Sequence, residues 1–169
     1  GGPVAVPSQD MVLGIYYLTQ ERPNSLGEGH YFKNLNEAIL AYENGYVKLH
    51  SRIHVRVTKK MADGTEKTGT VESTLGRFIF NEILPQDLGF VDRSIPENDL
   101  VLEVDFHVGK KGLKQILEKV INIHGATTTA EVLDDIKAMG YKYSTRAAMT
   151  VSISDMTVPE KKPALIKQA

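Results

Sequence analysis

Histidines often bind metals or move protons, and two of the histidines in this sequence lie four residues apart. The full set is His30, His50, His54, His107 and His124. His50 and His54 belong to an alternating segment, where a spacing of four keeps both side chains on one face of a strand. No Glu sits between them in the H-E-x-x-H arrangement of a zinc protease. We therefore favour a solvated strand face over a metal site.

Acidic residues gather in the region 92–105 but lack the spacing of a metal-binding loop. They are Asp92, Glu97, Asp99, Glu103 and Asp105. A calcium loop needs acids at alternate positions, a glycine and a closing Glu, and that order is absent. The P-loop, the dinucleotide-binding fingerprint and the G-x-S-x-G elbow are absent as well. The sequence therefore predicts no catalytic residue and no metal site within these residues.

Basic residues form a stripe with no acid among them in the middle of the chain. They are Lys48, Arg52, Arg56, Lys59 and Lys60. Such a stripe can contact phosphates, but a solvated strand face or an acidic neighbour explains it equally well. Arg77 follows Gly76 at a turn, which presents a guanidinium to an anion or a carboxylate. A bound anion and a structural ion pair remain equal alternatives for Arg77.

Gln9 and Asp10 form a polar pair at the start of a predicted helix over 8–19. Ser8 suits the N-cap, and Asp10 places a negative charge in the first turn. The exposed amides of a helix N-terminus also favour phosphate oxygens, so ordinary capping and ligand binding are both open for this pair. Apolar residues then run almost unbroken over 11–18. A helix that is apolar on so many sides belongs in an interior or an interface.

Capping and alternation predict the elements that position these residues. Asn34 begins a second helix, and Gly45 ends it. Residues 49–57 alternate as a half-buried strand, and Asp63-Gly64 is a strong hairpin signal. The other elements expected in the first two thirds are an edge strand at 4–6, a return strand at 68–74, a short helix from 76, an irregular segment at 86–99 and a strand at 101–108.

The last third of the chain is expected to contain several helices. Apolar residues keep helical spacing over 113–121, and Gly125 stops this helix. Thr128 and Glu131 form a capping box for the next helix, which Gly140 ends or kinks. The segments after it are a helix at 143–150, a polar loop at 152–157 and a final helix over 160–169 that has barely begun when the chain ends.

These segments predict an α+β fold, rich in helix, with a small antiparallel sheet or hairpin. We expect one domain over 1–158 and the start of a further helix over 159–169. The 169 residues can bury a core, and a net charge of −1 gives no global nucleic-acid signature. The absence of cysteine excludes disulfides and thiolate zinc sites within these residues. No apolar run approaches the length of a membrane span.

Three stretches carry a family signature in a fixed order. The first, over 6–19, reads V-P-S-Q-D-x-V-L-G-x-Y-Y-x-T. The second is S-T-L-G-R-F-I-F-N-E-I-L-P at 73–85, and the third is S-T-R-A-A-M-T-V-S-I-S-D-M-T-V-P-E-K-K at 144–162. Together they resemble the β′ subunit family of bacterial DNA-directed RNA polymerases, downstream of the catalytic aspartates. Because the sequence opens on Gly1-Gly2 without Met, we expect a piece of that much larger subunit.

The resemblance implies a parent enzyme that makes RNA from nucleoside triphosphates on a DNA template. The family's N-A-D-F-D-G-D motif and zinc-binding cysteines are absent here. Mg²⁺ and Zn²⁺ are therefore expected only elsewhere in the parent subunit, and these residues alone should be inactive. The resemblance implies a wall of the pore, or secondary channel, although the third stretch has less glycine than the family usually shows. The channel-lining residues it suggests are Gln9, Asp10, Arg77, Ser144, Thr145, Ser152 and Asp155.

The resemblance also implies partners and a location. The expected partners are the β, α, ω and σ subunits, template DNA, nascent RNA, and regulators of the transcript-cleavage type that dock at the channel rim. The expected location is the cytoplasm, in association with the nucleoid and with no membrane contact. The alternative is a free-standing, non-catalytic α+β interaction domain, which the lack of catalytic motifs also permits.

Overall fold

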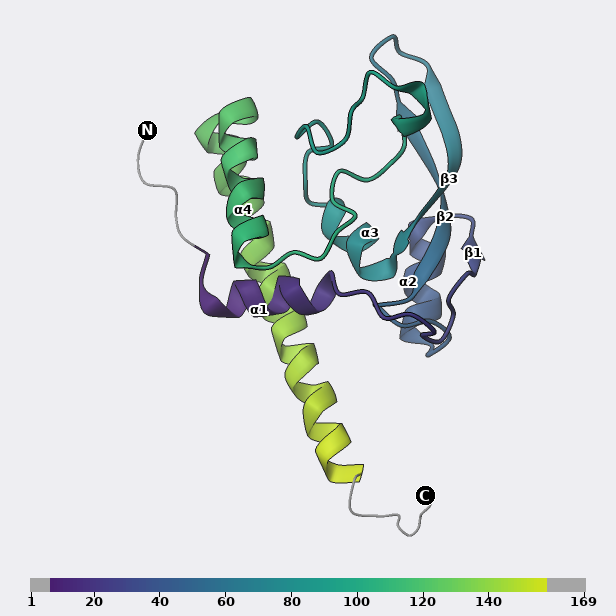
Figure 1. Cartoon of the computed structure of the whole chain (residues 1–169), viewed down its shortest axis with the longest axis vertical. Helices are drawn as coiled ribbons and strands as arrows, with labels where there is room; N and C mark the ends of the chain where they lie inside the picture. Colours follow the sequence, from purple (N-terminus) through teal and green to yellow (C-terminus); the bar gives the residue numbers. More distant parts are fainter. Residues whose placement is uncertain (1–6, 158–169) are drawn as a thin grey trace.

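The computed structural model describes residues 7–157, and side chains as far as residue 150. A long helix crosses a short one, and a small twisted sheet lies to one side of the crossing (Figure 1). The elements are α1 (Gln9–Leu18), β1 (Tyr31–Phe32), α2 (Leu35–Glu43), β2 (Arg52–Lys60), β3 (Glu66–Thr74), α3 (Leu75–Asn81), the 3-10 turn η1 (Pro96–Asn98) and α4 (Lys110–Thr157). The predicted helix-rich α+β class is confirmed. The edge strand predicted at 4–6 and the final helix predicted from 160 lie outside the described residues.

The two short N-terminal helices begin where the sequence predicts. The Ser8 hydroxyl accepts a hydrogen bond from the amide of Met11 at 3.3 Å. The Asn34 side chain accepts one from the amide of Glu37 at 2.8 Å. Each cap satisfies an amide that has no partner inside the helix, which is why polar residues occupy both positions. Gly45 follows α2 with a φ of 83°, a left-handed conformation that glycine adopts at low cost.

The sheet has three strands in the order β1-β2-β3. β2 and β3 form the predicted antiparallel hairpin, with Arg52 opposite Thr74 at its open end. The Asp63 carboxylate closes the turn by accepting bonds from the amide and hydroxyl of Thr65, at 2.9 and 2.6 Å. β1 pairs with β2 in parallel, so the sheet is mixed. The sequence does not predict β1, because two residues are too few to show alternation.

The helix α4 is two helical segments joined at Gly125, where φ is 86° and ψ is −178°. The predicted stop at Gly125 is therefore confirmed, but the second segment begins directly after it instead of at Thr128. The predicted break at Gly140 and the predicted loop at 152–157 are both wrong, because α4 continues to Thr157. The segment 152–157 contains neither glycine nor proline, and its small polar residues disfavour a helix only weakly.

The predicted strand at 101–108 is also wrong. Side chains, and not a neighbouring strand, bond to several of its backbone groups. Asn81 donates to the carbonyl of Val104 at 2.8 Å and accepts from its amide at 3.1 Å. The amide of Val108 donates to the Thr19 hydroxyl at 2.9 Å. Because these side-chain bonds replace a ladder, the segment crosses the molecule as an extended loop.

The hydrophobic core lies where α1, α3, β2 and α4 meet. Its largest fully buried apolar side chains include Ile15, Leu18, Ile53, Leu75, Phe80, Leu113, Ile116, Leu117 and Ile136. Gly76 lets α3 pack directly on the end of α1, since a Cβ at this position would stand 1.8 Å from the carbonyl oxygen of Leu18. The core therefore fixes the C-terminal end of α1 against both α3 and α4.

Candidate functional site

Helices α1 and α4 cross at a point where each carries a glycine. A Cβ on Gly14 would lie 1.9 Å from the carbonyl oxygen of Gly140. A Cβ on Gly140 would lie 2.8 Å from the Cα of Met11. Only glycine permits two helix backbones to approach so closely. Figure 1 shows α1 lying across α4 at this level. Gly140 therefore fixes the position of the crossing and does not end the helix.

An apolar groove lies beside the crossing, with a volume of about 530 Å³. Its lining includes Leu13, Tyr16, Tyr17, Gln20, Ser144 and Ala148. Leu13 and Tyr16 each remain 48% exposed, whereas the opposite side of α1 is buried in the core. The groove brings the first of the polymerase-like stretches into contact with the third. The sequence predicts that α1 lies in an interior or an interface. One side of α1 is buried in the core, and the side that lines the groove is apolar and partly exposed.

The predicted channel-lining residues do not all come together. Gln9 and Asp10 are exposed in the first turn of α1, at the far end of the helix from Gln20. Ser144 lines the groove, and Thr145 beside it is exposed. Two further predicted residues, at 152 and 155, lie on the described backbone of α4, but their side chains are outside the described set.

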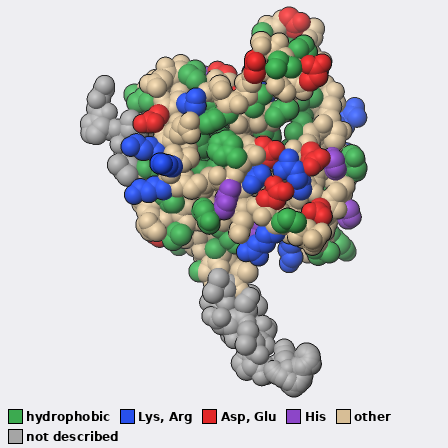
Figure 2. Space-filling view, in the orientation of Figure 1, with side chains coloured by type: hydrophobic (Ala, Val, Ile, Leu, Met, Phe, Trp, Pro, Cys, Tyr) green, Lys and Arg blue, Asp and Glu red, His purple; other side chains and the backbone are tan. Residues whose placement is uncertain are grey.

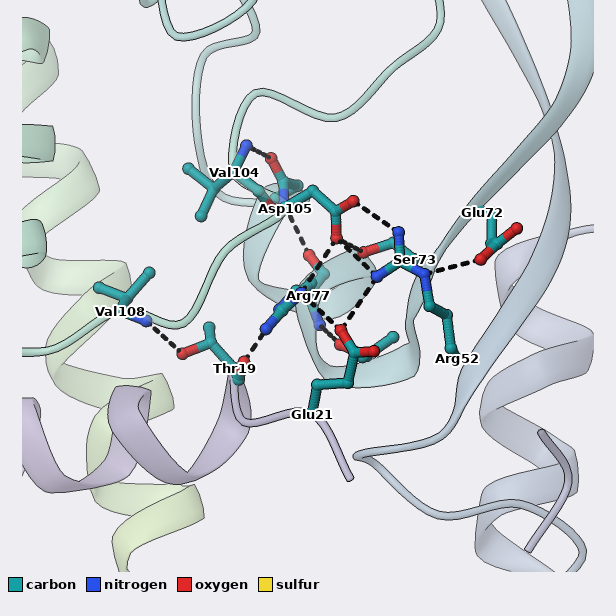
Figure 3. A network of polar contacts seen from close by, with 11 residues as sticks. Thr19, Glu21, Arg52, Glu72, Ser73, Arg77, Val104, Asp105 and Val108 are labelled. Carbon is teal, nitrogen blue, oxygen red and sulfur yellow. Dashed lines mark hydrogen bonds and ion pairs between the residues drawn. The ribbon is translucent and has the colours of Figure 1, made fainter. Parts of the chain in front are cut away.

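Arg77 is separated from these residues, because its side chain is only 6% exposed. Its Nε donates to the carbonyl oxygen of Thr19 at 2.9 Å. Its Nη1 lies 3.2 Å from a carboxylate oxygen of Glu21 and 3.2 Å from one of Asp105 (Figure 3). Of the two alternatives for Arg77, these contacts support the structural ion pair. The guanidinium caps the C-terminal end of α1 and ties it to α3.

Asp105 is the centre of this polar network. Its carboxylate accepts from the Ser73 hydroxyl at 2.6 Å, from Arg77, and from Arg52 at 2.8 Å. Arg52 donates in turn to Glu72 at 2.7 Å. Burial alone would raise the pKa of Asp105, but the bonds from Arg52 and Ser73 outweigh it and lower the pKa. The bond to Asp105 also raises the pKa of Arg52, so both groups stay charged.

Within the basic stripe, Arg52 thus faces acidic neighbours, which is one of the alternatives that the sequence leaves open. Figure 2 shows acidic and basic side chains interleaved in a patch on this face. Lys59 instead donates to a backbone group, the carbonyl oxygen of Asp99, at 3.2 Å. The sequence does not single out Asp105 or Glu21 as members of a site. The one signal is that Asp105 interrupts the apolar run at 101–108.

The stability of the fold should depend on the ionised form of Asp105. Because its pKa is lowered on folding, its contribution is complete above the unfolded pKa and is lost as the pH falls through the folded value. We expect the stability difference between the wild type and Asp105→Asn to shrink below about pH 4. Urea denaturation between about pH 3 and pH 6 measures it. The control is Asp134→Asn, at an exposed ion pair, which should change stability little at any pH. If the stability difference for Asp105→Asn did not shrink at low pH, the ionised Asp105 carboxylate would not be the stabilising group.

The histidines divide between buried and exposed positions. His50 is 5% exposed, so the predicted solvated face is wrong for this residue, which precedes β2 and packs under Tyr17. Its Nε2 lies 2.7 Å from the Tyr17 carbonyl oxygen, and burial lowers its pKa. His54 stacks on Tyr31 with ring centroids 4.1 Å apart. Among the side chains that the structure describes, no three His, Asp or Glu residues gather as metal ligands would. No helix of the described residues has the length and hydropathy to cross a membrane.

Comparison with known proteins gives one consistent family. The family model described as RNA polymerase Rpb1, domain 3 matches residues 1–156. Over all 169 residues, the chain is 71% identical to the protein named DNA-directed RNA polymerase subunit beta' of Lachnoclostridium phytofermentans. Proteins of the same name from Acetivibrio thermocellus and Clostridium acetobutylicum are 57% and 53% identical over 99% and 100% of the chain. The chain spans 14% of the length of each of these relatives. It belongs to the family of RNA polymerase Rpb1, domain 3.

Proposed function

We propose that this chain, within a bacterial RNA polymerase β′ subunit, forms part of the wall of the secondary channel through which nucleotides reach the active centre. The parent enzyme would make RNA on a DNA template, by magnesium-assisted attack of the RNA 3′-hydroxyl on a nucleoside triphosphate. These residues would supply no catalytic group. Their part would be to shape the access path and to offer a surface to regulators.

The observation that supports the proposal best is how the three polymerase-like stretches meet. They are separated in sequence by more than fifty residues, yet α1 contacts both of the others. Arg77 and Gly76 of the second stretch pack against the end of α1. Ser144 of the third shares the apolar groove with Leu13. A wall built from α1 and α4 would therefore hold its shape through contacts among all three stretches.

The predicted residues would have two kinds of role. Gln9 and Asp10, exposed at the N-terminus of α1, would face the passing nucleotide, where helix amides favour phosphate oxygens. Ser144 and Thr145, with the two predicted positions at 152 and 155, would extend the wall along α4. Arg77 would act differently, because it is buried and touches α1 and not solvent. It would hold the wall in place.

The parent assembly would supply everything else. The catalytic Mg²⁺ and the structural Zn²⁺ would be held by other parts of the β′ subunit. The β, α and ω subunits and σ would complete the enzyme, together with template DNA and nascent RNA. Regulators of the transcript-cleavage type would dock at the rim beyond α4. The assembled enzyme would work in the cytoplasm at the nucleoid.

A bulky label on the wall should obstruct nucleotide access without altering the chemistry. The chain has no cysteine, so Thr145→Cys in the assembled polymerase introduces one new thiol into this segment. Labelling it with a large maleimide should raise the KM for nucleoside triphosphates by roughly fivefold or more while leaving kcat near the unlabelled value. An obstruction of access reduces nucleotide delivery at low concentration and is overcome at saturation.

The matched control is Lys60→Cys with the same label, since Lys60 is exposed near the hairpin turn, far from the α1–α4 crossing along the sheet. Its KM should be unchanged. An unchanged KM for the labelled Thr145→Cys enzyme would count against a channel wall at this position. The alternative of a free-standing interaction domain has no specific observation in its favour.

A further inference from the structure

A second pocket shares Tyr17 with the apolar groove but has a different chemistry. Its volume is about 500 Å³, and none of its lining residues is acidic. Three cations line it from separate segments: Arg22 after α1, Lys48 before β2, and Arg146 on α4. Cations gathered in a cavity without a carboxylate create a positive potential that attracts anions. Its lining contains none of the charged residues of the Asp105 network.

These three cations have no carboxylate partner, in contrast to three arginines elsewhere in the described structure. Arg52, Arg77 and Arg93 each lie within 3.2 Å of an acidic oxygen. Among the described residues, Arg22, Lys48 and Arg146 make no ion pair. Their charge is therefore not neutralised by side chains of the described part of the fold. Charge gathered in this way is available to a ligand.

Backbone hydrogen bonds fix the two loops that carry the first two cations. The amide of Arg22 donates to the carbonyl oxygen of His50 at 3.0 Å, and the amide of Lys48 donates to that of Leu26 at 3.2 Å. The Ser25 hydroxyl donates to the carbonyl oxygen of Arg22 at 2.7 Å. The loops are thus tied to one another on both sides of the pocket. A frame that is ordered before binding lowers the entropic cost of binding.

Tyr42 on α2 holds the third cation. The guanidinium of Arg146 lies over the Tyr42 ring at 5.5 Å from its centroid and donates to the Tyr42 hydroxyl. A cation above an aromatic face is attracted by the negative potential of the ring. One edge of the guanidinium is used in this contact, and a guanidinium has further N–H groups to donate. Arg146 is therefore positioned but not saturated.

His50 forms part of the pocket wall and responds to the charge around it. Its Nε2 hydrogen donates to the carbonyl oxygen of Tyr17, which leaves Nδ1 as an acceptor when the ring is neutral. Burial lowers the pKa of His50 against the opposing effect of its bond to Tyr17, and the positive charge of Arg22 adds to the lowering. The imidazole therefore reports the electrostatic potential of the pocket, and a bound anion should perturb its NMR signals.

We infer that this pocket binds a small phosphate-bearing anion through Arg22, Lys48 and Arg146. Guanidinium groups match phosphate oxygens in a two-pronged geometry, and a lysine adds a mobile point charge. The volume is within the range of small-molecule sites and suffices for a pyrophosphate or a nucleotide. The inference stands apart from the channel proposal, because the binding is a property of this chain alone.

Titration calorimetry on the 169-residue chain at low salt, without divalent metal, tests the inference. The probes are inorganic pyrophosphate, ATP and adenosine. Pyrophosphate and ATP should bind, and adenosine should not. Tighter binding of ATP would identify a nucleotide as the ligand, whereas equal or tighter binding of pyrophosphate would identify the phosphate group alone. Pyrophosphate and ATP should each shift the NMR signals of the His50 imidazole.

A triple variant with Arg22→Gln, Lys48→Gln and Arg146→Gln should bind pyrophosphate at least about tenfold more weakly, since each charged hydrogen bond is worth a sizeable factor. The control removes the same amount of charge elsewhere, with Lys60→Gln, Lys111→Gln and Lys114→Gln at exposed positions. The control triple should keep the wild-type affinity within about twofold.

Several results would overturn the inference. One is the absence of pyrophosphate binding by the wild type at about 10 mM. Another is equal weakening by the two triple variants, because binding would then depend on net charge and not on the pocket. A third is binding of a glutamate-rich peptide that the pocket triple abolishes, with no binding of pyrophosphate, since the ligand would then be an acidic protein segment.

Discussion

Replacing Gly14 with alanine should destabilise the chain by more than about 3 kcal/mol, at or above the upper end of ordinary overpacking. The new methyl group would stand 1.9 Å from the carbonyl oxygen of Gly140. That neighbour is backbone and lies within α4, so it cannot move aside as a side chain can. The helices must therefore separate, and the groove beside the crossing would open with them. Urea denaturation followed by circular dichroism measures the loss.

The same substitution at Gly112 is the matched control. Gly112 also lies in a helix, but its Cβ would meet the Val108 side chain at 3.6 Å, which is an ordinary contact. Because alanine favours a helix over glycine by up to about 1 kcal/mol, Gly112→Ala should be neutral or slightly stabilising. If Gly14→Ala were as stable as the wild type, the two helices would not cross as closely as described.

Replacing Arg77 with methionine should cost about 3–5 kcal/mol, the range for removing one partner of a buried ion pair. Methionine keeps much of the length and the apolar contacts of arginine. It leaves the carbonyl oxygen of Thr19 without its side-chain donor and takes from Asp105 one of its two arginine partners, and Arg77 is 5% exposed, so water cannot readily replace the guanidinium. Arg77→Lys should recover only part of the loss, because one ammonium cannot reach all three partners of the guanidinium.

Two further variants separate the network from a general charge effect. Arg56→Met removes an exposed charge from the same sheet and should change stability by less than about 0.5 kcal/mol. Combining Arg77→Met with Asp105→Asn should cost less than the sum of the two single changes, since the bond between Arg77 and Asp105 can be lost only once. Strict additivity would mean that the two groups do not interact.

Local chemistry made part of this fold predictable. Ser8 and Asn34 cap helices, and Asp63-Gly64 closes a hairpin, because each acts on atoms within a few residues of itself. The break at Gly125 is local for the same reason, as a left-handed φ suits glycine wherever it lies. The family resemblance could also be recognised from the sequence, because the three stretches are defined by residue identity and order.

The prediction failed where a distant partner decides the outcome. Residues 101–108 have the composition of a strand, but Asn81 occupies the backbone groups of Val104 that a neighbouring strand would use. Glycine at position 140 is typical of a helix end, but here its lack of a side chain permits the close contact between α4 and α1. In both cases a tertiary contact, and not the local pattern of residues, decides the backbone structure.

The sequence by itself determined the starts of α1 and α2, the β2–β3 hairpin, the α+β class and the family. Only the tertiary structure decided that α1 crosses α4 at two glycines, that Arg77 is buried with Asp105, and that three cations surround one pocket. Arg77 and Thr19 are 58 residues apart, and Arg146 and Tyr42 are 104 apart. Contacts at such separations depend on how all the intervening elements pack, so no local pattern of residues encodes them.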